Sequence, residues 1–98
     1  MMRVVLPYHL RTLAGVGGEV RIDLAGAATY AMVVDEIEAA YPMLKGTIRE
    51  QGSGKRRPFV RFFACGQDVS HEGMDAAVPE EVAAGREVLI VLGAVAGG

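Results

Sequence analysis

The pattern of polar and apolar positions predicts two strands near the start of the chain. Residues 19–24 alternate between polar and apolar side chains, the pattern of a strand that buries one face. Residues 4–6 form a short apolar run that is rich in β-branched side chains. We expect the two segments to pair as a hairpin. An irregular connection over residues 9–15 joins them, with Leu10 and Leu13 as its apolar anchors.

Two more apolar runs predict strands in the second half of the chain. Residues 59–65 combine aromatic and β-branched side chains, and residues 88–92 are apolar throughout, as in a buried strand. Residues 66–69 indicate a turn that leads into a minor strand. Residues 70–84 show no sustained periodicity, so we expect a loop there with room for one short helical turn.

A helical period replaces the alternation from Tyr30 to Tyr41. Thr29 is a candidate N-cap, because its hydroxyl can accept a hydrogen bond from an N–H of the first turn, and Pro42 ends the helix. The apolar side chains share one stripe, and the acidic ones are expected to face solvent. The stripe comprises Tyr30, Val33, Val34, Ile37, Ala40 and Tyr41, and the solvated side comprises Asp35, Glu36 and Glu38.

Residues 43–50 are expected to add a further turn, with Leu44 and Ile48 facing inward. The predicted order is strand, strand, helix, strand, minor strand, strand. One main helix on one face of a small mixed sheet is an α+β, two-layer architecture. We therefore expect residues 1–98 to form a single domain of this class.

Composition narrows the possible functions. Hydrophobic residues make up 51% of the 98 residues and charged residues 22%, which is typical of a globular domain. The formal net charge of −2 argues against a polyanionic partner such as nucleic acid. No apolar run approaches the roughly 20 residues of a membrane span, and the N-terminus does not resemble a signal peptide. We expect a soluble, cytoplasmic protein with no membrane partner.

The residue types that carry chemistry are scattered. His9 and His71 lie far apart with no carboxylate spacing that indicates a metal site, so we expect surface or packing roles for both. Cys65 ends an apolar strand, where a buried and inert thiol is expected. The glycine-rich residues 52–55 and 15–20 each lack residues that a phosphate-binding loop requires. The sequence thus indicates no intrinsic catalytic or metal site.

A basic stretch, Lys55, Arg56 and Arg57, lies near Arg61. A solvated loop is the simplest interpretation, and docking onto an acidic protein partner is the functional alternative. Nucleic-acid binding would call for a broader basic face with stacking aromatic residues, whereas Phe59, Phe62 and Phe63 are expected to belong to the core.

The last five residues, Ala94, Val95, Ala96, Gly97 and Gly98, combine small side chains with two glycines. Fully extended, such a segment reaches about 16 Å. It could therefore thread into a narrow channel of another protein and present a carboxylate there. The alternative is a chain end whose composition has no functional meaning.

The sequence resembles the ubiquitin-like sulfur carriers of the MoaD/ThiS type. This family includes the small subunit of molybdopterin synthase, the thiamine-pathway carrier and the carrier for cysteine synthesis. The resemblance spans essentially the whole chain, and the closing Val-Ala-Gly-Gly is its most specific part. The other motifs are Leu10-Arg11-x-Leu13-Ala14-Gly15, Glu38-Ala39-Ala40-Tyr41-Pro42, Gly66-Gln67-Asp68-Val69 and Ala84-Gly85-Arg86-Glu87-Val88.

The resemblance implies a β-grasp fold and a non-enzymatic carrier whose C-terminal Gly98 is the reactive residue. An adenylating enzyme of the ubiquitin-activating type would use ATP to activate Gly98, and a sulfurtransferase would supply sulfur to give a thiocarboxylate. A sulfur-accepting synthase subunit would then consume the sulfur. Residues 94–97 would thread into the partner, and Leu10, Phe62 and Leu92 would contact it. The carrier itself is expected to bind no cofactor.

Two alternatives stay open. The chain could be a ubiquitin-like modifier that is conjugated through Gly98 to lysines of other proteins, or a β-grasp binding module with an incidental tail. The closing residues are compatible with the molybdopterin and cysteine branches and fit the thiamine branch less well, and the polar loop 51–57 favours the cysteine branch. Gly66, Arg86 and Gly93 depart from the residues that the family often has at these positions.

Overall fold

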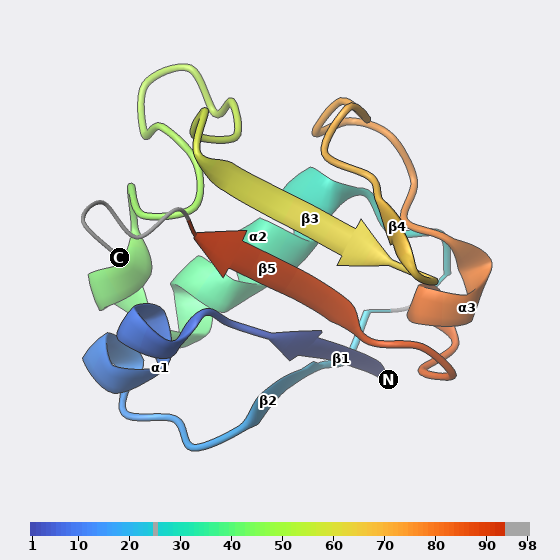
Figure 1. The fold of residues 1–98 in the computed structure, drawn as a ribbon, viewed down its shortest axis with the longest axis horizontal. Helices are drawn as coiled ribbons and strands as arrows, with labels where there is room; N and C mark the ends of the chain where they lie inside the picture. Colours follow the sequence, from blue (N-terminus) through green and yellow to red (C-terminus); the bar gives the residue numbers. More distant parts are fainter. Residues whose placement is uncertain (25, 94–98) are drawn as a thin grey trace.

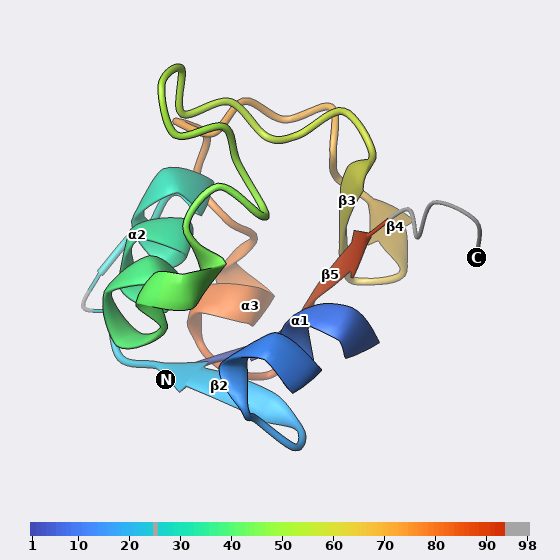
Figure 2. The same cartoon turned by 90° about the vertical axis from the view of Figure 1, so that its left-hand side faces the viewer.

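The computed structural model describes residues 1–24 and 26–93 of the chain. Its elements, in chain order, are β1 (Met2–Val5), α1 (Tyr8–Ala14), β2 (Glu19–Ile22), α2 (Tyr30–Ala40), the 3-10 helix η1 (Pro42–Leu44), β3 (Val60–Ala64), β4 (Gln67–Asp68), α3 (Glu80–Ala83) and β5 (Leu89–Gly93). The strands form one sheet, and α2 crosses one of its faces (Figure 1). Seen from the side, α2 and the strands β3, β4 and β5 lie in separate layers (Figure 2). The predicted α+β architecture is confirmed.

The sheet has the strand order β2-β1-β5-β3-β4. The predicted hairpin of β1 and β2 is antiparallel, with Met2 opposite Ile22 and Val4 opposite Val20. The last strand, β5, lies between β1, to which it runs parallel, and β3, to which it runs antiparallel. Strand β5 is therefore the central strand of the sheet, and it ends at Gly93.

Helix α2 begins and ends close to the predicted positions. The Thr29 hydroxyl oxygen accepts a hydrogen bond from the Met32 N–H at 3.2 Å, as expected of the N-cap. The stripe that starts at Tyr30 is buried through Ile37, and Ala40, which was predicted to belong to it, is exposed. The inward-facing Leu44 and Ile48 are both fully buried, as predicted, although the segment that carries them contains only the single 3-10 turn η1.

The prediction of an irregular connection over residues 9–15 is wrong, because most of these residues form helix α1. The helix follows Pro7 and ends at Gly15, whose φ of +74° is readily adopted by glycine. Leu10 is its only buried residue, while Leu13, the second expected anchor, is 52% exposed. Seven residues with one buried side chain give no readable helical period, which explains the error.

Glu38 is not on the solvated side of α2, where it was predicted. Its side chain is only 11% exposed, and its Oε1 lies 2.9 Å from Nη2 of Arg49, which also contacts Asp35 Oδ1 at 2.5 Å. The hydrogen bond that Arg49 donates to Glu38 is the main cause that raises the pKa of Arg49 above its ordinary value. The pair fastens the segment after η1 to the outer surface of α2.

One apolar cluster connects the sheet with all three α-helices. Tyr30 of α2 and Phe62 of β3 stack across it with ring centroids 5.5 Å apart and an interplanar angle of 6°. Within residues 1–24 and 26–93, no helix is both long enough and apolar enough to cross a membrane.

Candidate functional site

The candidate site lies where β5 ends. Gly93 is the last residue that the structure describes, so the predicted reactive Gly98 and the predicted threading residues Ala94, Val95, Ala96 and Gly97 lie outside the described residues. Their roles stay predictions. The structure does define the end of β5 at Gly93 and the residues around it, Pro7, His9, Pro58, Phe59, Arg61 and Leu92, and we call this surface the tail root.

The tail root is crowded on one side. A Cβ atom added to Gly93 would lie 2.8 Å from Cε1 of His9 and 3.7 Å from Cγ of Pro7, so a larger residue here would require the His9 imidazole to move. His9 itself is exposed, in agreement with its predicted surface role. On the other side, Gly93 lines a shallow hollow of about 260 Å³ together with Pro58, Phe59, Arg61 and Leu92.

From the tail root, an apolar strip runs across the face of the sheet that α2 leaves uncovered. Its members are partly exposed and come from three adjacent strands. Phe63 of β3 lies opposite Ile90 of β5, which in turn pairs with Val5 of β1. Leu92, 44% exposed, extends the strip toward Gly93. A second hollow of about 320 Å³ lies over β3 and β5, lined by Phe63, Ala64, Cys65, Gly66, Glu87, Val88, Ile90 and Leu92.

Two of the three predicted contact residues are in the core instead of on this face. Leu10 is 4% exposed and Phe62 is 2% exposed, so neither can touch a partner without unfolding of the domain. Only Leu92 is accessible. The cause is the alternation of strand side chains, because Phe62 points toward α2 and its neighbour Phe63 points the other way.

Sequence reasoning missed Phe59, which was expected in the core and is 73% exposed next to Gly93. The alternation within β3 was a usable signal. Val60, Phe62 and Ala64 share one face and are buried, which places Arg61 and Phe63 on the other face. Phe59 precedes β3 and is outside the ladder, so no periodicity fixed its direction.

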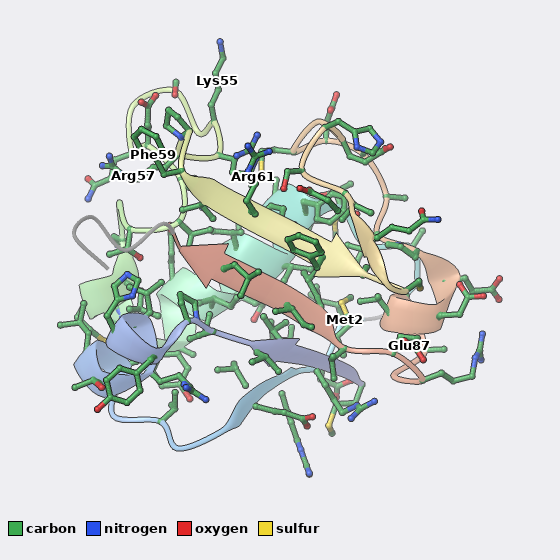
Figure 3. All side chains as sticks on the ribbon, in the orientation of Figure 1. Met2, Lys55, Arg57, Phe59, Arg61 and Glu87 are labelled. Carbon is green, nitrogen blue, oxygen red and sulfur yellow. The ribbon has the colours of Figure 1, made fainter. Side chains whose placement is uncertain are left out.

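Charged side chains surround the tail root unevenly. Lys55, Arg57, Phe59 and Arg61 lie at the end of the sheet where β5 finishes, and Glu87 lies at the opposite end (Figure 3). Arg61 Nη1 is 3.8 Å from Asp68 Oδ2, and both side chains are well exposed, so this pair leaves most of the arginine's charge available.

Cys65 was expected to be buried, and the structure shows it exposed at the turn between β3 and β4, with a φ of +54°. Partial loss of hydration, followed by the charges of Glu81 and Glu87, raises the pKa of its thiol. The raised pKa favours the protonated thiol over the thiolate, and the expected lack of reactivity stays a prediction. Among the described residues, no three His, Cys, Asp or Glu side chains are grouped to hold a metal ion.

Comparison with solved structures shows that the fold of the whole chain is similar to that of known small proteins. The chain is similar to SAMP1 from Haloferax volcanii with a TM-score of 0.76 and 25% identity, over 99% of this chain and 98% of that one. It is similar to the CysO-containing BexX/CysO complex of Amycolatopsis orientalis with a TM-score of 0.75 and 27% identity, over the full length of both chains. For CysO of Mycobacterium tuberculosis the TM-score is 0.71 with 25% identity, over 95% of this chain and 98% of that one.

No protein-family model and no curated relative matches the sequence. The structural neighbours are small β-grasp proteins with the same mixed sheet, which confirms the predicted fold. They are carriers and modifiers instead of enzymes. The likeness covers each chain almost end to end, including the strand that leads to the tail root. The chain is therefore similar, over nearly its full length, to ubiquitin-like sulfur carriers and modifiers, and this likeness supports the predicted resemblance to the MoaD/ThiS-type family.

Proposed function

We propose that the chain is a sulfur carrier whose C-terminal Gly98 is converted to a thiocarboxylate. The observation that supports the proposal is the full-length likeness to CysO and SAMP1, combined with a central strand that leads directly into Ala94–Gly98. The fold supplies the body of the carrier, and the five residues after Gly93 supply its reactive arm.

The chemistry takes place in partner enzymes. In the first step a carboxylate oxygen of Gly98 attacks the α-phosphorus of ATP, which forms an acyl adenylate and releases pyrophosphate. A persulfide of a sulfurtransferase then attacks the acyl carbon, AMP leaves with the C–O bond electrons, and an acyl disulfide forms. A second thiol reduces that disulfide, which leaves the thiocarboxylate on the carrier and a disulfide on the donor side.

Gly97 and Gly98 fit this chemistry physically. Neither has a Cβ atom, so the acyl carbon is open to attack and the arm fits a channel that is only as wide as a backbone. The carrier contributes the carboxylate and its delivery, and the adenylating enzyme contributes ATP binding and transition-state stabilisation. Because the reactions need ATP and a reducing environment, we place the carrier in the cytoplasm.

Among the branches of the family we favour the cysteine-synthesis branch over the molybdopterin branch. Two of the similar structures contain CysO, and the chain carries the polar loop 51–57 that suggested this branch. In either branch a synthase subunit accepts the sulfur and returns the carboxylate form of the carrier.

The proposal is tested by intact mass spectrometry of the chain after incubation with its adenylating enzyme, ATP and a sulfur donor. The expected result is a mass gain equal to the difference between one sulfur and one oxygen atom. A chain without Gly97 and Gly98 serves as the control and should not react. An unchanged mass in the presence of an enzyme that forms the adenylate would contradict the carrier function.

A second candidate function is protein modification. Its support is the likeness to SAMP1 at 25% identity over nearly the whole chain. In this case the adenylated Gly98 is attacked by a lysine amine of a target, AMP leaves, and an isopeptide bond forms. Peptide mapping after trypsin digestion checks this function, because cleavage after Arg86 would leave residues 87–98 on the modified lysine, and these adducts should vanish when Gly98 is deleted.

A further inference from the structure

The end of the sheet at the tail root combines three features that a docking surface needs. It carries exposed apolar side chains, Phe59 and Leu92, that are 73% and 44% exposed. It carries the exposed cations Lys55, Arg57 and Arg61 (Figure 3). We call the surface made of these three cations together with Phe59 and Leu92 the basic end. It also contains the hollow beside Gly93, into which an apolar group of a partner can fit.

The loop that carries the basic end is folded. The Glu50 N–H donates to the Lys55 carbonyl oxygen at 2.8 Å, and the Gly54 N–H donates to the Glu50 carbonyl oxygen at the same distance. The Arg57 N–H donates to the Ile48 carbonyl oxygen at 3.0 Å. The Arg49 contacts with α2 hold the start of this loop. The cations are thus presented by an ordered support, which lowers the entropy lost when a partner binds.

Two of the three cations of the basic end have no ion-pair partner among the described residues, and the third, Arg61, has only the exposed pair with Asp68. Across residues 1–24 and 26–93, neither Lys55 nor Arg57 forms an ion pair, and Arg57 Nε donates instead to the carbonyl oxygen of Gly46. At the far end of the sheet, Glu81 and Glu87 are close enough to Cys65 to raise the pKa of its thiol. They share that end with the exposed Arg86, so the basic end carries more positive charge than the far end, although the whole chain has a net charge of −2.

The position of the tail root restricts which protein covers this end. This step rests on the proposed function of Gly98. Five residues beyond Gly93 span at most about 16 Å, so the enzyme that activates Gly98 has its reaction centre within that distance of the tail root. The surface of that enzyme around the channel must then lie against Phe59, Arg61 and their neighbours.

We propose that the basic end docks onto an acidic rim around the tail-receiving channel of the adenylating enzyme, with Phe59 and Leu92 in apolar contact inside that rim. The difference in charge between the two ends sets the orientation, because the opposite orientation would bring Glu81 and Glu87 against the acidic rim. Opposite charges also speed the encounter of the two proteins, and this effect weakens as salt rises.

The test measures the dissociation constant between the carrier and the adenylating enzyme by calorimetry at low and moderate salt. The double substitution Arg57→Glu and Arg61→Glu is expected to weaken binding about tenfold or more at low salt, with a smaller effect at higher salt. Arg86→Glu is the matched control, because Arg86 is an exposed arginine at the far end of the sheet. It should change the dissociation constant by less than about twofold.

A second pair of variants tests the apolar contact. Phe59→Ala is expected to weaken binding about tenfold, as for an aromatic anchor at an interface. Met32→Ala removes an exposed apolar side chain from α2, on the covered side of the sheet, and should leave binding unchanged. Circular dichroism spectra of all variants establish that they remain folded.

Three outcomes would overturn the proposal: no binding of the wild-type chain, equal losses for Arg86→Glu and the double substitution, or no loss for either. Concentration-dependent sedimentation of the chain alone that the double substitution abolishes would also overturn it, since a second copy would then occupy the basic end. The mass measurement on Gly98 is independent. Sulfur transfer without charge-dependent binding refutes only the interface, and charge-dependent binding without sulfur transfer refutes only the carrier function.

Discussion

Substitution of Phe62 tests whether this residue belongs to the core or to the docking surface. Its ring is 2% exposed and stacks on Tyr30, so Phe62→Ala removes a buried aromatic side chain and leaves a cavity. Such substitutions cost about 3–5 kcal/mol. For a domain of this size, a loss of that magnitude lowers the midpoint of thermal unfolding by roughly 15–30 °C.

Leu92→Ala is the matched comparison on the adjacent strand. Leu92 is 44% exposed, so its truncation removes only part of the contacts of a buried leucine and should cost about 1 kcal/mol. Urea unfolding followed by tyrosine fluorescence and far-ultraviolet circular dichroism measures both free energies, because the chain contains three tyrosines and no tryptophan. Comparable losses for the two variants, or a loss below about 1 kcal/mol for Phe62→Ala, would refute the assignment of Phe62 to the core.

Three further predictions concern stability. Gly85→Ala should destabilise the fold by about 2–4 kcal/mol, because Gly85 has a φ of +82° and its added Cβ would meet a backbone oxygen at 2.4 Å. Gly15→Ala should cost only about 1 kcal/mol in the same urea assay, because Gly15 has a φ of +74° but no atom within 4 Å of the added Cβ. Arg49→Met strands a largely buried carboxylate on α2 and should cost about 2–3 kcal/mol, and full stability of this variant would contradict the role of the bridge. Hydrogen bonds from Ser70 are the main cause that lowers the pKa of Asp68. The ionised carboxylate therefore stabilises the fold above the ordinary aspartate pKa of about 3.9, and this stability is lost as the pH falls through the lower folded-state value. The difference in unfolding free energy between wild type and Asp68→Asn should shrink toward zero with acidification.

The strands and α2 were predictable because each has a regular period over a sufficient length. The alternation in residues 19–24 and the stripe from Tyr30 to Ile37 are local signals that match the burial in the structure. The bounds shifted by one or two residues at several ends, where hydrogen bonding in the sheet decides the limits. The fold class followed from the order of these elements.

The remaining features depend on contacts between segments that are distant in sequence. Glu38 is buried because Arg49 reaches it from the loop after η1, and nothing within α2 indicates this partner. Helix α1 forms around a single buried leucine that packs against the core. The predicted contact residues were chosen because they are apolar, but the alternation of side chains along β3 and β5 separates the buried Phe62 from the accessible Phe63 and Leu92.

The central claim is that Gly98 carries the sulfur, and fragmentation of the intact chain in the mass spectrometer tests it most directly. The chain is isolated after reaction with the adenylating enzyme, ATP and the sulfur donor, and its fragments are compared with those of the unreacted chain. We expect every fragment containing Gly98 to gain the mass difference between sulfur and oxygen, and fragments that end before Gly98 to be unchanged. A gain that maps to Cys65, or to any fragment that excludes Gly98, would contradict it.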